Sequence, residues 1–196
     1  MTDPWTGEPN LAELRRAYHL IESKDPGAIP MLENLVSVGS VMAMVYLGTA
    51  FQKGLNGRPD RVEAEKWYRR AIETNRGGSY LAAFNLGSAY FRDGNYEAAK
   101  KMYIIGATVG HLPSMYWLAR THLEDSTESR NLDEIRQLLE KAAAGGHLHA
   151  QRKLAIVLMR QGIMSPSFFR GLWMFLILGP RAFSVALRNP SSELLK

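Results

Sequence analysis

The chain has 196 residues, 46% of them hydrophobic, which is enough for one domain or a short solenoid with a buried core. It contains no cysteine, and this excludes disulfides, zinc–thiolate sites and a thiol nucleophile. The net charge of +5 is unevenly placed, because residues 150–196 hold seven Lys or Arg against the single acid Glu193. This basic end is either an ordinary solvated face or a surface that meets an anionic partner or an anionic membrane.

Residues 1–10 lack the pattern of a cleaved export signal. They place Asp3, Pro4, Glu8 and Pro9 where such a signal needs basic residues followed by an apolar run. We therefore expect a cytoplasmic protein, and we assign residues 1–27 to an N-terminal capping helix region.

An internal repeat dominates the rest of the sequence. A leucine followed by a small residue recurs at spacings of 39, 32 and 36, in Leu47-Gly48, Leu86-Gly87, Leu118-Ala119 and Leu154-Ala155. A small residue precedes each leucine by four positions: Ala43, Ala82, Ser114 and Ala150. Steps of four mark one face of a helix, and small residues on that face let a neighbouring helix approach closely.

A second helix is predicted to follow each of these after a turn. At its clearest, Asp60 is the expected N-cap with Glu63 three residues on, as in a capping box. The apolar face of this helix runs through Ala64, Trp67, Tyr68 and Ala71. The same positions in the next two units hold Ala99, Met102, Tyr103 and Gly106, and then Ile135, Leu138, Leu139 and Ala142. A partial unit before them holds Ala28, Met31, Leu32 and Leu35. Gly39, Gly110 and Gly146 each end such a helix.

This pattern resembles the Sel-one-like repeat (SLR), a relative of the tetratricopeptide repeat. The best match is residues 43–71, with Tyr46-Leu47-Gly48, the loop 54–57 and the run Lys66-Trp67-Tyr68-Arg69-Arg70-Ala71 in the family's order. The resemblance covers residues 28–162 and leaves residues 163–196 as an apolar, basic C-terminal helix and tail. It implies an all-α fold, a right-handed α-solenoid of stacked antiparallel helix pairs, and a use in protein assembly with no fixed ligand.

The first helix of each pair is expected to line the concave surface of such a stack. Side chains one before, two after and six after each leucine project together from the core: Tyr46, Thr49, Lys53, Asn85, Ser88, Arg92, Trp117, Arg120, Glu124, Lys153, Ile156 and Arg160. Five are Lys or Arg and only Glu124 is acidic, which suits an acidic protein segment or a free C-terminal carboxylate. The alternative is a solvated helix face.

Catalytic and nucleic-acid functions find little support in the sequence. His111, His147 and His149 suggest a metal site, but His111 and His147 recur just after the glycine that ends a helix, which favours a role in the turn. Phosphate loops, nucleophile elbows and dinucleotide-binding glycine patterns do not occur, so no cofactor is expected. The basic residues are spread along helices without a nucleic-acid recognition module. We expect a non-enzymatic adaptor or scaffold.

The C-terminal segment departs from the repeat. Ser165-Pro166 is a predicted helix start, Gly179-Pro180 its end, and nine of the eleven residues 168–178 are large and apolar. This helix is too short to span a membrane. Its expected contact residues are Phe168, Phe169, Trp173, Phe175 and Ile177. They could cover an anionic membrane surface, a protein partner or a second copy, or pack on the repeats, and a membrane-peripheral accessory subunit is therefore the alternative function.

Overall fold

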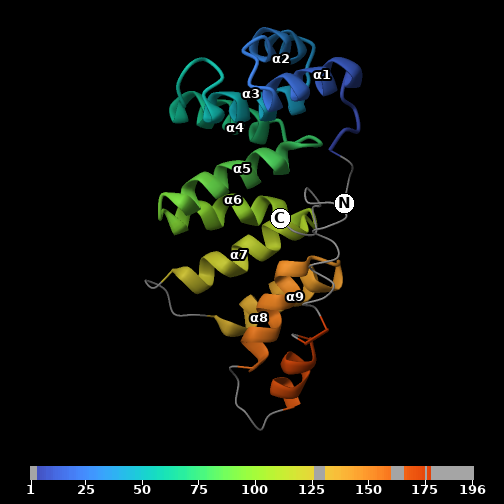
Figure 1. Cartoon of the computed structure of the whole chain (residues 1–196), viewed down its shortest axis with the longest axis vertical. Helices are drawn as coiled ribbons and strands as arrows, with labels where there is room; N and C mark the ends of the chain where they lie inside the picture. Colours follow the sequence, from blue (N-terminus) through green and yellow to red (C-terminus); the bar gives the residue numbers. More distant parts are fainter. Residues whose placement is uncertain (1–3, 126–130, 160–165, 175, 178–196) are drawn as a thin grey trace. The chain divides into compact units, whose positions relative to one another are not determined.

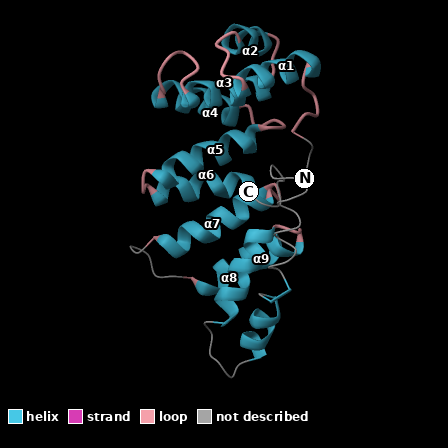
Figure 2. Cartoon of the chain, viewed as in Figure 1, coloured by secondary structure: helices cyan, strands magenta, loops and turns pink. Residues whose placement is uncertain are grey.

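The computed structural model describes residues 4–125, 131–159, 166–174 and 176–177. Within these ranges all regular secondary structure is helical, and short turns join successive helices (Figures 1 and 2). The chain divides into two compact units, Met1–Val109 and Gly110–Lys196.

The first unit contains three helix pairs. Its helices are α1 (Leu11–Glu22), α2 (Ala28–Ser37), α3 (Val41–Lys53), α4 (Arg61–Glu73), α5 (Ser79–Arg92) and α6 (Tyr96–Thr108). The two helices of each pair pack on one another, and α3 and α4 both contact α5, so consecutive pairs stack. The pair α1/α2 packs on α3 at the start of this unit.

The second unit repeats this arrangement with α7 (Leu112–Glu124), α8 (Leu132–Ala144) and α9 (Leu148–Met159). In it α8 packs on both α7 and α9. Residues 166–174 and 176–177 are also helical and return along α9. A Cβ placed on Gly171 would lie 2.5 Å from the Ala155 carbonyl oxygen and 3.1 Å from Leu158 Cβ. This last helix therefore pairs with α9, as α8 does with α7.

Polar side chains fix where the helices begin. The carboxylate of Asp60 accepts the Glu63 backbone N–H at 3.0 Å, which confirms the predicted cap of α4. Ser40, Asn95 and Asn131 cap α3, α6 and α8 in the same way. Since each such bond satisfies an N–H that the helix itself leaves unpaired, these residues set the register of the stack.

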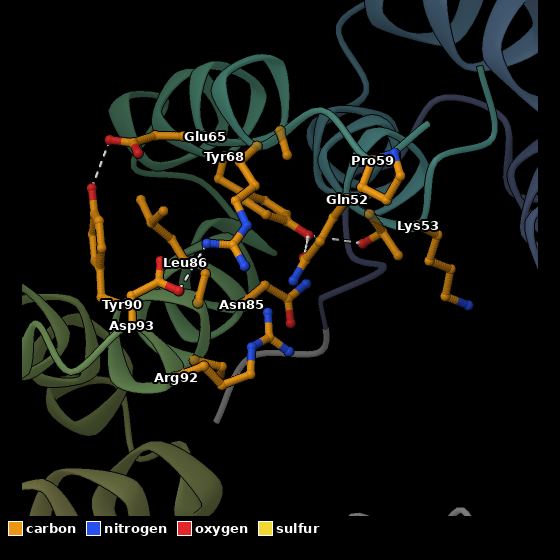
Figure 3. Close-up of a pocket in the computed structure, with 15 residues that line it drawn as sticks. Gln52, Lys53, Pro59, Glu65, Tyr68, Asn85, Leu86, Tyr90, Arg92 and Asp93 are labelled. Atoms are coloured by element: carbon orange, nitrogen blue, oxygen red, sulfur yellow. Dashed lines mark hydrogen bonds and ion pairs between the residues drawn. The ribbon is translucent and has the colours of Figure 1, made fainter. Parts of the chain in front are cut away.

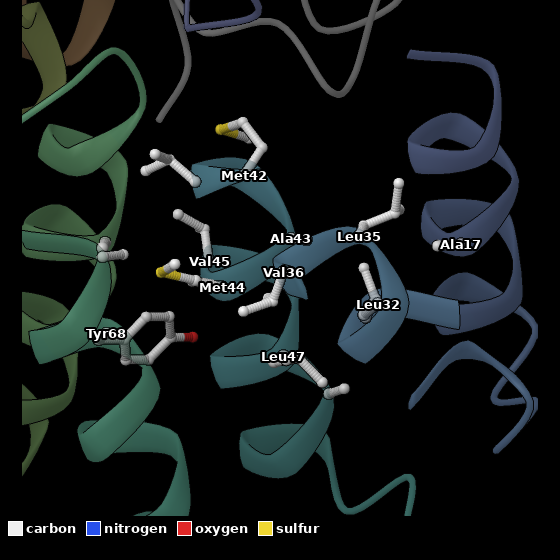
Figure 4. Close-up of a cluster of buried hydrophobic side chains, with 14 of the residues drawn as sticks. Ala17, Leu32, Leu35, Val36, Met42, Ala43, Met44, Val45, Leu47 and Tyr68 are labelled. Carbon is white, nitrogen blue, oxygen red and sulfur yellow. The ribbon is translucent and has the colours of Figure 1, made fainter. Parts of the chain in front are cut away.

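In two of the pairs, a glycine of the first helix packs directly against a tyrosine ring of the second. Tyr68 is buried in the core cluster of the first unit (Figure 4), and a Cβ on Gly48 would lie 2.5 Å from its ring. The next pair repeats the contact, because a Cβ on Gly87 would lie 3.0 Å from the buried Tyr103 ring. In the pair α7/α8 the equivalent residues are Ala119 and Leu139, both fully buried in one apolar cluster.

These observations confirm the fold class. The leucine anchors and the small residues four positions before them are buried: Ala43, Leu47, Ala82, Leu86, Ser114, Leu118, Ala150 and Leu154. The chain is an all-α, tetratricopeptide-like solenoid of stacked antiparallel helix pairs. The division at residues 27 and 162 stays a prediction.

Replacing Gly48 with Ala is expected to destabilise the protein by about 1 to 3 kcal/mol, because the added methyl overlaps the Tyr68 ring. Without that overlap the same change in a helix would stabilise by about 0.5 to 1 kcal/mol. Urea unfolding of Gly48→Ala, Tyr68→Ala and the double variant measures the coupling. The Gly48→Ala penalty should vanish in the Tyr68→Ala background, and an unchanged penalty would contradict the assigned contact.

Candidate functional site

A cavity of about 610 Å³ opens in the first unit among α3, α4 and α5 (Figure 3). Its walls are formed by Thr49, Gln52, Lys53, Pro59, Arg61, Ala64, Glu65, Tyr68, Asn85, Leu86, Ser88, Ala89, Tyr90, Arg92 and Asp93. Five of the six groove residues that the sequence predicts on α3 and α5 are in this set. They are Thr49, Lys53, Asn85, Ser88 and Arg92.

The hydroxyl of Tyr68 lies in the cavity, although its ring belongs to the core. It donates to Gln52 Oε1 at 2.9 Å and lies 3.2 Å from Thr49 Oγ1. Burial raises the pKa of Tyr68 to about 12, and hydrogen bonds with Thr49 and Asn85 oppose this shift. The phenol therefore stays neutral and serves as a polar floor of the cavity.

The hydroxyls of Thr49 and Ser88 are already engaged within the protein. Thr49 donates to the Val45 carbonyl at 3.1 Å, and Ser88 donates to the Phe84 carbonyl at 2.8 Å. Tyr103 in turn donates to Ser88 at 3.2 Å, as the counterpart of the Tyr68–Thr49 contact. These two predicted groove residues thus hold the tyrosines of the repeat in place.

Three hydrogen-bond donors face the open part of the cavity. Because the oxygen of Gln52 accepts from Tyr68, its amide nitrogen points toward Asn85, and Arg92 lies beyond Asn85 on the same helix (Figure 3). No carboxylate of the described residues lies within 4.0 Å of Arg92, whose side chain is exposed. Two amides and a guanidinium without an internal counter-ion favour an anionic ligand.

The other charges of the cavity are paired. Arg61 lies 2.9 Å from Asp93, and Lys53 lies 2.7 Å from Glu22 of α1. Both pairs are largely exposed, so each contributes little to stability. Because Arg61 and Lys53 are paired in this way, Arg92 is the cation best placed to bind a ligand among the described residues of this cavity.

A second polar cluster closes the opposite rim. Tyr90 donates to Glu65 at 2.6 Å, and Arg69 donates to the Tyr90 hydroxyl at 2.8 Å. The bond from Tyr90, with help from Arg69, lowers the pKa of Glu65, while burial and the Glu65 carboxylate raise the pKa of Tyr90. Glu65 therefore stays ionised and neutralised by its own neighbours.

Tyr46, the remaining predicted groove residue of α3, lies outside the cavity. Its ring centroid is 5.3 Å from Tyr18 of α1 and 6.2 Å from Trp5. Burial, followed by the proximity of Tyr18 and Glu8, raises the pKa of Tyr46. The chain's own residues therefore cover this part of the α3 face.

The predicted groove residues of the second unit lie on α7 and α9. The Arg120 guanidinium stacks over the Trp117 ring at 4.7 Å and lies 3.8 Å from Glu124. Lys153 is on α9 and half-buried, and Arg160 lies outside the described residues. These positions stay predictions for binding.

Sequence reasoning missed Gln52 and placed Tyr68 and Tyr90 only in the core. Gln52 lies between the predicted groove face and the core face, where helical period gives no signal. The two tyrosines do follow the core period, but their hydroxyls extend beyond the apolar layer into the cavity.

His111 and His147 form hydrogen bonds in the turns that precede α7 and α9, as the sequence predicts. His147 is fully buried, and its Nδ1 accepts the Ala150 backbone N–H at 3.0 Å. His111 Nδ1 lies 2.8 Å from Ser114 Oγ at the start of α7. Among the described residues no group of three or more His, Asp or Glu side chains could hold a metal ion.

The C-terminal helix exposes much of its apolar surface. Phe169 is 58% and Trp173 68% exposed, Ile177 is also exposed, and Phe168 is half-buried. Trp173 and Ile177 line a second cavity, of about 660 Å³, together with residues of α8 and α9. The side chain of Phe175 lies outside the described residues. In the described part of the chain, no helix combines the length and apolarity that crossing a membrane requires.

Comparison with protein families gives a match to the Sel1 repeat at residues 41–73, 81–111 and 112–147, just over half of the chain. The chain belongs to the Sel1 repeat family. The three matched segments coincide with the pairs α3/α4, α5/α6 and α7/α8, so both units contain Sel1 repeats. A comparison with curated proteins gives no match.

Solved structures show the same fold. A Sel1 repeat protein from Oxalobacter formigenes aligns over 86% of this chain and 69% of its own, with a TM-score of 0.69 and 19% identity. The antigen c5321 of uropathogenic Escherichia coli, which displays an SLR fold, aligns over 87% of this chain with a TM-score of 0.70 and 19% identity. This chain spans 39% of c5321. MamA aligns over 87% of this chain and 96% of its own, with a TM-score of 0.60 and 17% identity.

The raised pKa of Tyr68 predicts an alkaline loss of stability. A phenol that ionises at about 12 in the fold, against about 10 when unfolded, contributes stability that is present below pH 10 and lost as pH rises through 12. Tyr68→Phe removes this contribution, so its unfolding free energy should fall less than that of the wild type between about pH 9 and 11. Urea titrations at both pH values test this, with Tyr96→Phe of α6, whose ring packs on Phe91, as control. Parallel pH profiles for all three proteins would contradict it.

Proposed function

We propose that this Sel1 repeat protein is a non-enzymatic adaptor that binds an acidic segment, or a free C-terminal carboxylate, of a partner protein in the α3–α5 groove. We define this groove as the cavity of about 610 Å³ lined by Gln52, Tyr68, Asn85 and Arg92. The observation that carries the proposal is the convergence of two side-chain amides and the Arg92 guanidinium on one open cavity.

The chemistry of these groups suits an extended acidic peptide. A guanidinium binds a carboxylate through two parallel N–H donors, and side-chain amides bond to the peptide groups of an extended chain. Pro59, Ala64 and Leu86 contribute apolar wall to the same cavity, so a short side chain next to the carboxylate could also be buried. The positive charge of the groove thus selects an anionic group of the ligand, and the apolar walls select the side chains next to that group.

The family supports a binding role of this kind. Stacked helix pairs form extended surfaces that commonly mediate protein–protein interaction. The structures of the Oxalobacter protein, c5321 and MamA support the fold alone, since each is less than 25% identical to this chain.

Arg92→Gln is expected to weaken binding of a fluorescent peptide ending in several glutamates by about tenfold, the effect of losing about 1.4 kcal/mol from one charge-assisted pair. Fluorescence anisotropy at low salt measures the dissociation constant. Circular dichroism should show unchanged helicity, because Arg92 is exposed.

Two controls accompany this measurement. Arg58→Gln removes another exposed arginine, one that does not line the cavity, and it should leave the affinity unchanged. A matched peptide of glutamines should bind no variant. Equal affinity of the wild type and Arg92→Gln for the glutamate peptide would rule out this groove.

A second candidate function is peripheral attachment to an anionic membrane through the C-terminal helix. It is favoured by the exposed rings of Phe169 and Trp173, which lie beside Arg170. Apolar side chains flanked by basic ones suit the interface of an anionic bilayer.

Phe169→Ser combined with Trp173→Ser should abolish flotation of the protein with phosphatidylglycerol vesicles if the C-terminal helix is a membrane contact. In the wild type, each of these rings buries apolar area worth about 1.5 to 3 kcal/mol when it enters the bilayer interface, and the serine variants lose this contribution. Val62→Ser, which removes an exposed apolar side chain from α4, serves as the control. A wild-type chain that does not float with these vesicles would exclude the membrane role.

A further inference from the structure

Residues 4–8 lie across the start of α3 and cover part of the face that the groove uses. We call these residues the strap. Both oxygens of the Glu8 carboxylate bind at the start of α3: Oε1 accepts the backbone N–H groups of Val41 at 3.1 Å and Met42 at 2.9 Å, and Oε2 accepts the Ser40 hydroxyl. The strap thus presents an acidic group to α3.

An aromatic contact and a close backbone approach place the rest of the strap. The rings of Trp5 and Tyr46 meet edge to face at a centroid distance of 6.2 Å. At its other end, the Pro4 carbonyl oxygen lies 3.6 Å from where a Cβ on Gly78 would stand, just before α5. The strap therefore reaches from α3 to the start of α5, and both of these helices contribute residues to the groove.

The strap and the groove meet the same face of α3. Tyr46, Thr49 and Lys53 follow at steps of three and four, so they share one side of the helix. Thr49 and Lys53 line the groove, whereas Tyr46, about 10 Å before Lys53 along the helix, is covered by Trp5. A ligand that ran from the groove toward the start of α3 would meet the strap.

We propose that the strap is an internal acidic, aromatic occupant of this face, and that its release lengthens the groove as far as the side of Tyr46 that Trp5 covers, while Tyr18 of α1 stays in contact with that ring. This inference rests on the proposed function of the groove. The strap limits the bound segment to what fits between Gln52 and Arg92, and longer acidic segments bind only by displacing Glu8 and Trp5 from α3. The protein therefore discriminates ligands by length through a competition within its own chain.

Hydrogen exchange of the full chain tests the strap independently of any ligand. The N–H groups of Val41 and Met42 stand at the start of α3, where a helix supplies no acceptor of its own, and both donate to Glu8. Glu8→Ala should speed their exchange about tenfold or more, while amides in the middle of α3 stay protected. Glu13→Ala, which changes an exposed acid of α1, should leave all of these rates unchanged.

Peptides of two lengths then test the competition. A peptide of about four glutamates spans about 13 Å and should bind the wild type and Glu8→Ala equally, whereas one of about ten glutamates spans about 33 Å and reaches Tyr46. If the strap is closed for about nine-tenths of the time, the long peptide should bind Glu8→Ala about tenfold more tightly than the wild type.

The outcomes separate the two proposals. Unchanged exchange at Val41 and Met42 in Glu8→Ala overturns the strap, whatever the peptides do. Faster exchange with equal affinity of the long peptide for both proteins overturns the competition while leaving the groove intact. Faster exchange with no binding of either peptide overturns the proposed function, and the length discrimination falls with it.

Discussion

The close packing of a tyrosine ring on a glycine is the contact on which the first unit depends. Gly48 and Gly87 leave room for the rings of Tyr68 and Tyr103, and no side chain larger than hydrogen fits without movement of the ring. This contact sets the spacing between the helices of a pair. Since α3, α4 and α5 pack on one another, the same spacing fixes how the next pair stacks.

The same tyrosines connect the rigid core to the groove. Each ring is buried, yet each hydroxyl reaches a Thr or Ser on the groove face of the first helix. The polar floor of the cavity is thereby held by the core, and an already placed floor spares a ligand part of the entropic cost of ordering the site. Arg92 is exposed and forms no ion pair with the described residues, so its side chain can follow the ligand.

Helical period was enough to predict the buried faces, because one apolar stripe fixes the orientation of a whole helix. Leu47, Leu86 and Tyr103 are buried for this reason. Period also placed Asn85 and Arg92 on the groove side, but it could not show which polar groups are already bonded. Thr49 is engaged by Tyr68, which lies on another helix.

The sequence also could not predict contacts between the repeats and segments that lie outside the repeat pattern. Nothing in the repeat indicates that Trp5 and Glu8, outside it, reach α3 and cover Tyr46. Gln52 gave no signal either, because its role follows from the position of the Tyr68 hydroxyl. The sequence thus predicted faces of helices, while the site depends on hydrogen bonds between them.

The third Sel1 repeat, α7/α8, fills the equivalent positions with a different pair of residues. Where the first two repeats pair glycine with tyrosine, the third pairs Ala119 with Leu139, so the added methyl of one partner accompanies the smaller side chain of the other. The two positions of a repeat should therefore covary. A repeat that drifts from one pair to the other keeps its helix spacing but loses the hydroxyl, and with it the polar floor. Selection on the core alone can thus convert a hydrogen-bonding groove into an apolar one.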